Sequence, residues 1–491
     1  QGRFVKEVAD FAVRFVKSQY EDQEVVKAPD YKSTDVLIVI KLKGENKAFS
    51  ASKYEHSYPH CWRTDKPILY YPLDSWFIKT TQIKDRLVEL NKTINWKPES
   101  TGTGRFGNWL ENLQDWNLSR SRFWGTPLPI WATEDGKERQ CIGSLEELKT
   151  EVAKSIKAGF MKVQIADNFD LHRPYVDEVY LVSSKGQKMT REKDLIDVWF
   201  DSGAMPYAQW HYPMENKELF ESSFPADFIA EGVDQTRGWF FTLHVIGAML
   251  FDSITFKNVV SNGLVLDKEG NKMSKRLGNA ADPFEIIEKY GPDATRWYMI
   301  TNAQPWDNLK FDESGIAEVK RKFFNTCFNT YAFYALYANI DGYVGQEEYI
   351  PIKDRPEIDR WIISLLNSLV KDVDNYYDSY EPTKAGRAIQ KFVDANLSNW
   401  YVRLCRRRFW KGEYSADKIA AYQTLDHCLQ TVAKLSSPIA PFFMDKLYMD
   451  LTGEESVHLS DFQELDESVI DKDREERMTI AQNISSMVLS L

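Results

Sequence analysis

A change of pattern part-way along the chain is the feature that most limits what it can fold into. Between about residues 61 and 310, short apolar runs alternate with amphipathic segments: "DVWF" before a Ser-Gly turn, "DFIA" before "EGVDQTRGWFFTLHVIGAML", and "NVVSNGLVL" before "DPFEIIEKYG". Such alternation is typical of a parallel sheet whose strands are joined by helices. After Pro356 only helical spacing remains, as in the apolar residues from Ile358 to Val373. The sequence therefore predicts an α/β domain with a parallel sheet, followed by an all-α helical bundle.

The domain boundaries follow from the same patterns, and 491 residues leave room for about three cores. We expect residues 1–60 to be the edge of a β-rich unit with connecting strands, because they contain strand-like runs such as "DVLIVIKL" (Asp35 to Leu42). Residues 61–310 are the predicted α/β domain, with an insertion at about 130–195 where charged, poorly periodic segments interrupt the pattern. Residues 311–355 are a connecting helical region, and residues 356–491 are the helical bundle.

Composition argues against several classes of protein. The apolar run from Trp239 to Phe251 is too short to span a membrane, and the five cysteines stand singly, which suits a reducing compartment. We therefore expect a soluble protein of the cytoplasm. His56, His60 and Cys61 lack a fourth ligand at a recognisable spacing, so we predict no metal held by side chains, zinc included. The chain begins with Gln1 instead of Met, and we expect it to begin within a longer protein.

A loop rich in cations lies between a strand-like run and the start of a helix. In "GLVLDKEGNKMSKRLGNAADPFEII" (Gly263 to Ile287), Asp282 stands at the N-cap position and Pro283 at the first helical position. Doubly wound sheets bind ligands at such strand-to-helix crossings, and lysines there can neutralise the oxygens of a polyphosphate. A lysine-rich loop is more often a solvated hairpin, yet "KMSKR" is expected by chance in roughly one chain of this length in several thousand. The match to this particular pentapeptide, and not the lysine content alone, favours phosphate chemistry.

The pentapeptide at residues 272–276 resembles the Lys-Met-Ser-Lys-Ser/Arg signature of the class I aminoacyl-tRNA synthetases, whose mobile loop closes on ATP. Four other stretches, in the family's order, resemble its isoleucyl branch: "YEHSYPHCWRTDKPILYYPLDSWFIKTT", "NWLENLQDWNLSRSRFWGTPLPIW", "DVWFDSGAMPYAQ" and "AEGVDQTRGWFF". The valyl branch usually continues its Ser-Arg motif with Trp-Trp-Gly-His, where this chain has "FWGTP". The resemblance implies a Rossmann-type parallel sheet that forms the second half of a class I catalytic core, followed by an anticodon-binding helical domain.

The resemblance also implies roles for particular residues in ATP-dependent, Mg²⁺-assisted activation of isoleucine. It makes Lys272 and Lys275 the catalytic cations, and Trp199 and Trp239 the walls of the amino-acid pocket, although by periodicity alone both tryptophans are core residues. Seven residues are expected at ATP or the adenylate: Glu231, Gly232, Asp234, Gln235, Met273, Ser274 and Arg276. Without the resemblance, Glu231 and Asp234 are more often a solvated turn and a helix cap, with Asp234 as the N-cap of the following helix.

Two groups of residues are candidates for contact with tRNA. Arg120, Arg122 and Trp124 combine cations with an aromatic ring around a glycine turn, a composition that suits phosphate or a stacked base, although half of such runs are structural. In "NWYVRLCRRRFWKG", Arg403, Arg406 and Arg407 belong to a run of four arginines within six residues. A charged face is usually only solvated, but this run exceeds what solubility needs and could contact RNA phosphates.

Two departures from the family pattern limit what this chain can do alone. None of the seven histidines forms the family's His-x-Gly-His motif, and only the tail of an editing domain is expected. We therefore predict an isoleucine-tRNA ligase in the context of a full-length, monomeric enzyme with isoleucine, ATP and tRNA(Ile) as partners, and no activation or editing by these 491 residues alone. The alternatives are a valyl- or leucyl-type synthetase and a non-catalytic tRNA-binding relative.

Overall fold

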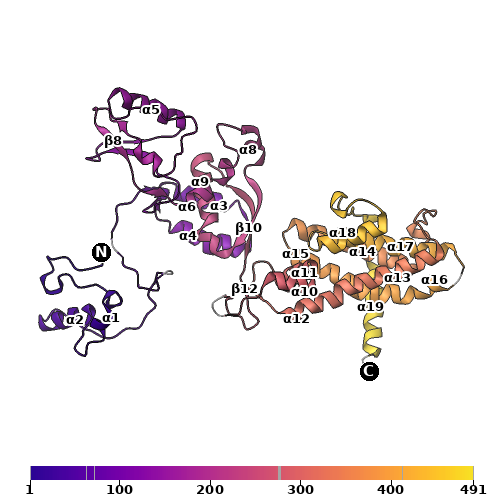
Figure 1. Cartoon of the computed structure of the whole chain (residues 1–491). Coiled ribbons are helices and arrows are strands. Elements are labelled where there is room, and N and C mark those ends of the chain that lie inside the picture. The colour runs from indigo at the N-terminus through magenta and orange to yellow at the C-terminus, as the bar shows by residue number, and fades with distance from the viewer. Residues whose placement is uncertain (1, 62–63, 71, 275–277, 412, 490–491) are drawn as a thin grey trace. The chain divides into compact units, whose positions relative to one another are not determined.

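A computed structural model describes residues 2–61, 64–70, 72–274, 278–411 and 413–489 of the chain (Figure 1). These residues divide into two compact units, Gln1–Trp76 and Phe77–Leu491.

The first unit is not built from strands, which corrects the prediction for residues 1–60. The run "DVLIVIKL" lies within helix α2 (Thr34–Gly44), where the Ser33 hydroxyl caps the helix by accepting the Val36 N–H. The other α-helix of the unit is α1 (Gln23–Val26), and its described residues contain only the isolated β-bridges Arg3↔Phe15 and His60↔Pro67. A β-branched run with no partner strand satisfies its backbone groups within a helix instead.

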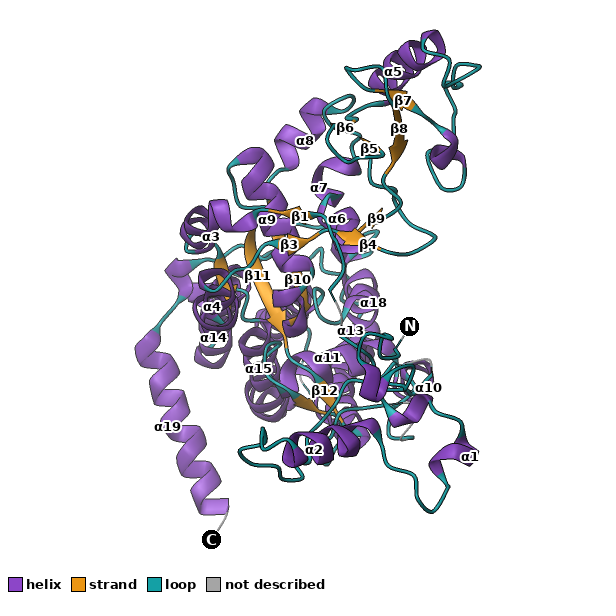
Figure 2. Cartoon of the chain, turned by 90° about the vertical axis from the view of Figure 1, so that its left-hand side faces the viewer, coloured by secondary structure: helices purple, strands orange, loops and turns teal. Residues whose placement is uncertain are grey.

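The second unit contains a three-stranded parallel sheet (Figure 2). Its strands are β10 (Ala226–Gly232), β11 (Phe256–Asn262) and β2 (Asn95–Lys97), in the order β10-β11-β2. Glu231 pairs with Ser261 and Gly232 with Asn262, so the carboxyl ends of β10 and β11 lie at one edge. The predicted parallel α/β fold is confirmed.

Three helices pack against this sheet and share one core with it. They are α3 (Lys84–Asn91), α4 (Gly107–Glu111) and α9 (Trp239–Phe251). Trp96 of β2 meets Phe240 of α9 edge to face, with ring centroids 5.6 Å apart. His244 of α9 is completely buried among these residues and its Nε2 lies 2.9 Å from the Leu87 carbonyl oxygen.

The run "DVWF" forms a helix and not a strand, which is a second correction. It opens α6 (Val198–Gly203), whose N-cap Asp197 accepts the Trp199 N–H at 3.3 Å. Asp197 is buried and also binds Arg120 at 2.7 Å, so a contact from far along the chain fixes this helix start. Gly203 lies so close to α9 that an added Cβ would be 2.9 Å from Ile246.

Residues 130–191 form a separate antiparallel sheet with its own core. Its strand order is β6-β5-β8-β7, with β5 at Ile130–Thr133, β6 at Arg139–Cys141, β7 at Leu181–Val182 and β8 at Lys188–Arg191. Helix α5 (Leu145–Lys157) packs Leu148 and Val152 against Trp131. The remaining short strands are β1 (Phe77–Ile78), β3 (Trp116–Asn117), β4 (Ser119–Arg120), β9 (Leu195–Ile196), β12 (Val265–Leu266) and β13 (Leu309–Lys310).

From Pro283 onward the unit is mainly helical, and its helices share one large core (Figure 1). The short helices α7 (Met205–Ala208) and α8 (Lys217–Ser223) precede β10. The later helices are α10 (Pro283–Tyr290), α11 (Pro292–Asn302), α12 (Glu313–Val319), α13 (Asn325–Asp341), α14 (Glu357–Asp378), α15 (Pro382–Lys391), α16 (Arg403–Trp410), α17 (Ala416–Ser436), α18 (Pro441–Thr452) and α19 (Lys472–Leu489). A π-helical segment, Phe392–Val402, joins α15 to α16. The predicted helical bundle is confirmed.

A buried ion pair ties three of these helical segments together. Asp359 of α14 is fully buried and binds Arg408 of α16 through both carboxylate oxygens, at 2.6 and 2.9 Å. The Tyr401 hydroxyl also donates to Asp359, at 2.8 Å. Burial, together with the Asp359 charge, raises the pKa of Tyr401 well above its usual value. Breaking such a network costs more than an exposed ion pair would, because a charge is left unpaired in the core.

Candidate functional site

The crossing after β10 places two carboxylates at the carboxyl edge of the sheet. Glu231 is the penultimate residue of β10, and Asp234 lies in a 3₁₀ turn, Val233–Arg237. Both are exposed, and neither forms an ion pair with any residue the structure describes. An added Cβ on Gly232 would lie 2.6 Å from Asp234 Oδ1, so the glycine allows this carboxylate to fold back over the strand end. Carboxylates at such an edge can bind an ammonium group or ribose hydroxyls.

Asp234 does not cap helix α9, which corrects the sequence expectation. The helix begins at Trp239, and its first N–H is bound by Gln235, whose Oε1 lies 3.0 Å from the Trp239 nitrogen. Asp234 instead accepts a hydrogen bond from the Gln235 side-chain amide at 3.0 Å. The 3₁₀ turn moves the helix start toward the C-terminus, and only the longer Gln235 side chain reaches it.

The two tryptophans expected in the amino-acid pocket come from two helices that pack together. The Trp199 ring of α6 lies against Gly238, where an added Cβ would be 3.2 Å from it. Trp239 of α9 is half-buried and donates its indole N–H to the Ser202 carbonyl at 2.9 Å. The structure therefore brings the Trp199 ring against the residue that directly precedes Trp239.

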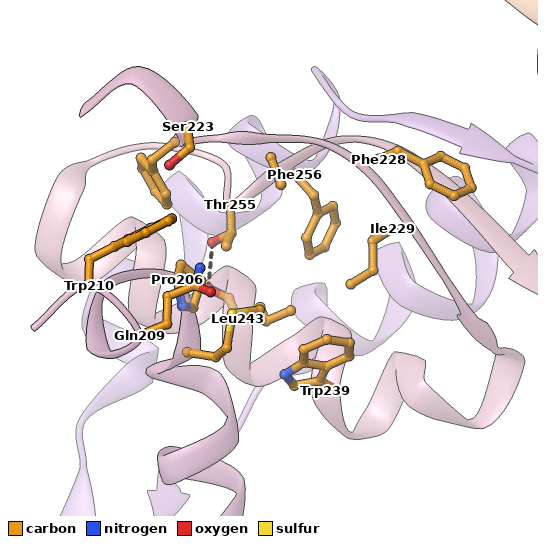
Figure 3. Close-up of a pocket in the computed structure, with 13 residues that line it drawn as sticks. Pro206, Gln209, Trp210, Ser223, Phe228, Ile229, Trp239, Leu243, Thr255 and Phe256 are labelled. Carbon is orange, nitrogen blue, oxygen red and sulfur yellow. Dashed lines mark hydrogen bonds between the residues drawn. The ribbon is translucent and has the colours of Figure 1, made fainter. Parts of the chain in front are cut away.

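A cavity of about 180 Å³ opens beside Trp239 (Figure 3). Phe228 and Ile229 of β10, Phe256 at the start of β11 and Trp210 also line it, and Thr255 in its wall donates to the Leu243 carbonyl at 2.7 Å. Trp199 is not among its lining residues. Thr255, Phe256 and Ala226 lie at the amino ends of the two strands, so most of this apolar cavity lies away from the edge that carries Glu231 and Asp234.

The basic loop after β12 is organised around one carboxylate. Asp267 Oδ1 accepts the Asn271 N–H at 2.7 Å and Oδ2 accepts the Asn279 side-chain amide at 2.9 Å. The hydrogen bonds from Asn279 and from the Asn271 N–H lower the pKa of Asp267, which stays ionised. The same Asn279 binds the Ser274 N–H through Oδ1 at 2.8 Å. Asp267 and Asn279 therefore fix both ends of the segment that carries the "KMSKR" motif.

Three residues of that motif, Lys272, Met273 and Ser274, are described by the structure. Lys272 is exposed and forms no ion pair among the described residues, while Met273 and Ser274 are half-buried. The predicted residues Lys275 and Arg276 lie outside the described residues. An exposed, uncompensated ammonium group at Lys272 can meet a phosphate without first breaking an internal salt bridge.

Sequence reasoning missed two further features of this region. Asp267 could have been found from the turn "DKEGN", because an Asp that binds the backbone of a following turn residue is a common turn device. Arg105 follows β2 and donates from Nε to the Thr236 hydroxyl in the turn after β10, at 2.9 Å. No local signal predicts this contact, because residues 105 and 236 are distant in the sequence.

The residues expected to contact tRNA differ in how far they are engaged within the chain. Arg120 donates to Asp197 at 2.7 Å and to the Asn117 and Ser119 carbonyls at 2.9 Å, so its charge is already paired within the chain. Arg122 and Trp124 are exposed. Arg403, Arg406 and Arg407 are exposed on α16, and none of the three forms an ion pair with a described residue. Their tRNA contacts stay predictions.

The described residues contain no group of three or more His, Cys, Asp or Glu side chains placed to hold a metal ion. Nor does any helix among them combine the length and the apolar character that crossing a membrane requires. All five cysteines lie among the described residues, and no disulfide joins any two of them.

Comparison with known proteins assigns the two parts of the chain to families. Residues 7–312 match the model of tRNA synthetases class I (I, L, M and V), and residues 359–491 match the anticodon-binding domain of tRNA ligases. Among curated relatives, the isoleucine--tRNA ligase of Cytophaga hutchinsonii is 68% identical over the whole chain, and that of Bacteroides fragilis is 62% identical over 98% of it. The chain spans only 45% and 44% of those two proteins.

Two solved structures share the fold at low sequence identity. Mycobacterium tuberculosis methionyl-tRNA synthetase in complex with methionyl-adenylate is similar over 79% of this chain and 65% of its own, with a TM-score of 0.56 and 20% identity. The leucyl enzyme LeuRS from Agrobacterium radiobacter K84, in a ternary complex with tRNA and LeuAMS, is similar over 73% of this chain and 43% of its own, with a TM-score of 0.55 and 19% identity. The parallel sheet and the helical domain of this chain are thus found together in known synthetases. The chain belongs to the class I tRNA synthetases of the I, L, M and V group.

Proposed function

We propose that this chain is the part of an isoleucine-tRNA ligase that holds the second half of the catalytic sheet and the anticodon-binding helices. The observation that carries the proposal is what lies at and after the carboxyl ends of two neighbouring strands. The exposed carboxylates Glu231 and Asp234 lie at the end of β10, and the chain that leaves β11 passes through β12, of a separate two-stranded sheet, into the "KMSKR" loop. Identity above 60% to relatives named isoleucine--tRNA ligase supports isoleucine over valine or leucine.

The proposed reaction has two steps. The isoleucine carboxylate attacks the α-phosphorus of ATP and pyrophosphate leaves, giving isoleucyl-adenylate. A ribose hydroxyl at the end of tRNA(Ile) then attacks the acyl carbon and AMP leaves. Neither step needs a covalent bond to the protein, so the residues act by positioning and by charge stabilisation.

Each group of residues has a defined part in this scheme. Lys272 and Lys275 stabilise negative charge on the phosphates, with Met273, Ser274 and Arg276 in the same loop. Glu231, Gly232, Asp234 and Gln235 hold the polar groups of the adenylate, and Trp199 and Trp239 bound the isoleucine side chain. Mg²⁺ commonly binds through the phosphates of its nucleotide, and we propose that it enters this site in that way. When bound, it supplies further charge neutralisation.

The sheet itself supports the view that other parts of the protein complete the site. Among the described residues β10 pairs on one side only, with β11, although it is seven residues long. A long edge strand exposes unpaired backbone groups and normally needs covering. We propose that the covering strand belongs to the remainder of a full-length, monomeric cytoplasmic enzyme, and that these 491 residues alone neither activate isoleucine nor edit.

The test is isoleucine-dependent pyrophosphate exchange by the full-length enzyme. Replacing Lys272 and Lys275 together by alanine is expected to slow exchange about a hundredfold or more, as loss of charge-stabilising groups does elsewhere. The matched control is Lys268→Ala in the same hairpin, whose exposed side chain pairs with Glu269, at 3.8 Å; it should stay within about threefold of the parent. Normal exchange by the double variant would refute the role of the loop. Pyrophosphate exchange that depends on valine or leucine would favour a valyl- or leucyl-type synthetase. Absence of exchange with isoleucine, valine and leucine would favour a non-catalytic relative.

The helical domain has its own test, in which tRNA(Ile) binding is measured against salt concentration. Replacing Arg403, Arg406 and Arg407 by alanine should weaken binding and lower the slope of log K against log salt by about 0.7 to 0.9 for each phosphate that the variant no longer neutralises. An unchanged slope would show that α16 does not face the RNA backbone.

A further inference from the structure

Two exposed aromatic rings stand side by side in the loop after β4. Phe123 is 66% exposed and Trp124 is 67% exposed. Neighbouring rings this exposed leave apolar faces open to solvent, which usually marks a place where something binds.

The residues that hold these rings come from the insertion, about fifty residues later. The His172 ring stacks on Trp124 with centroids 4.9 Å apart and an interplanar angle of 10°. The Arg173 guanidinium lies over the Phe123 ring, 5.3 Å from its centroid. His172 and Arg173 therefore back the two aromatic rings as a second layer.

That second layer is itself fixed by hydrogen bonds. Both the backbone N–H and Nδ1 of His172 lie within 2.9 Å of Asp170 Oδ1. Arg173 donates from Nε to Asp177 at 2.8 Å and from Nη1 to the Arg122 carbonyl at 3.1 Å. The insertion thus clamps the loop through its backbone, and the outer ring faces are presented in a preorganised position, which lowers the ordering cost of binding.

The charges around the rings favour an anionic ligand. Arg122 and Lys193, whose carbonyl accepts from Arg173, are exposed, and neither forms an ion pair with a described residue. The neighbouring carboxylates are engaged within the chain: Asp177 pairs with Arg173 and Arg191, Asp170 binds His172, and Asp194 accepts from the Ser121 hydroxyl. Aromatic faces beside exposed cations are the combination that binds unpaired nucleotides, with the base stacked on the ring and the phosphate near the cation.

We infer that Phe123, Trp124, His172 and Arg173 form a stacking platform for an unpaired base of RNA. The inference deepens the proposed tRNA function and rests on it. It adds His172 and Arg173 as positioning residues and assigns stacking, not phosphate binding, to Trp124.

The experiment uses the 491-residue chain and a six-nucleotide single-stranded RNA that carries one 2-aminopurine, whose fluorescence is quenched when it stacks. The parent chain is expected to quench the probe, and Trp124→Ala should weaken binding about tenfold or more. Trp124→Phe keeps a ring and should retain most of the quenching, whereas His172→Ala should give an intermediate loss. In a blunt RNA hairpin the same base is paired and already stacked, so adding the chain should cause no further quenching. The matched control is Phe284→Ala, an 80% exposed aromatic residue on α10, which should behave as the parent.

Two results would overturn the platform: no quenching by the parent chain, or equal quenching by the parent and Trp124→Ala. Neither result touches the proposed ligase function, because that is read separately from amino-acid-dependent pyrophosphate exchange. If pyrophosphate exchange by the full-length enzyme did not depend on isoleucine while the chain still quenched the RNA probe, the ligase assignment would be wrong and the RNA-binding surface would remain.

Discussion

The buried histidine of α9 gives a sharp prediction about how stability depends on pH. His244 is completely buried and its Nε2 lies 2.9 Å from the Leu87 carbonyl oxygen, while Nδ1 has no hydrogen-bond partner among the described residues. This burial lowers the pKa of His244 to about 4, because a charged ring there would lose its water. The folded protein therefore keeps the ring neutral at pH values where the unfolded chain protonates it.

The sign and size of the effect follow from the two pKa values. Between the unfolded value, about 6.5, and the folded value, about 4, the unfolded chain binds a proton that the folded chain does not. The free energy of unfolding is therefore unaffected by His244 above the unfolded pKa, and it decreases as pH falls from there toward the folded pKa. At pH 5 the loss relative to pH 7 is about 2 kcal/mol, taking about 1.36 kcal/mol for each pKa unit.

The variant that isolates this effect is His244→Gln. Its side-chain amide can donate to the Leu87 carbonyl as Nε2–H does, but it does not titrate. Hydrogen exchange of α9 peptides, corrected for the intrinsic rate at each pH, gives the local free energy of opening for both proteins. Asp426 works in the opposite direction, since burial raises its pKa to about 6, but it is present in both proteins and cancels in their difference.

We expect the parent to lose about 2 kcal/mol more opening free energy than His244→Gln between pH 7 and pH 5. Equal losses in the two proteins would refute the reasoning, because they would mean that the folded ring accepts its proton without penalty.

Two further predictions concern packing and buried charge. Gly102 lies in the π-helical segment Thr101–Phe106, and Gly102→Ala should lower the thermal unfolding midpoint and cost about 1 to 3 kcal/mol, because its Cβ would lie 2.3 Å from Trp96 Cδ1. Gly104→Ala, in the same segment with no described atom within 4 Å, should be neutral or slightly stabilising. Equal midpoints for the two variants would contradict the packing argument. Asp359→Ala should destabilise the helical domain by about 3 to 5 kcal/mol in urea unfolding, since it leaves Arg408 without its buried partner. Asp417→Ala, which removes the exposed partner of the same arginine, should cost about 1 kcal/mol or less. A similar cost for both variants would contradict the role of burial.

The long helices were predictable because their pattern repeats. In α14 the apolar residues from Ile358 to Val373 follow helical spacing over more than four turns, and most are buried. Helix α10 was predictable from its start signal alone, since Asp282 accepts the Phe284 N–H at 2.8 Å and Pro283 opens the helix. In both cases the information lies within a few neighbouring residues, where sequence reasoning is strongest.

The failures share a different physical origin. "DVLIVIKL" and "DVWF" are short apolar runs, and a run of four to eight residues cannot be assigned to strand or helix by periodicity. The assignment depends on whether a partner strand is present, or on a distant cap such as Asp197 held by Arg120. The mistaken cap at Asp234 is similar, because only the fold reveals that a 3₁₀ turn delays the helix until Trp239.

The arginine run of α16 shows why composition alone overstates a binding surface. Cys405 and Phe409, one helical turn apart, are buried, and Arg408 lies between them on the inner side, where it pairs with Asp359. Arg403, Arg406 and Arg407 fall on the outer side of the same helix. A run that looks like four equivalent cations therefore contains one residue that stabilises the core and three that are available to a polyanion. Because the inner arginine anchors α16 to α14, the position of the outer three depends on a buried ion pair on the opposite side of the helix.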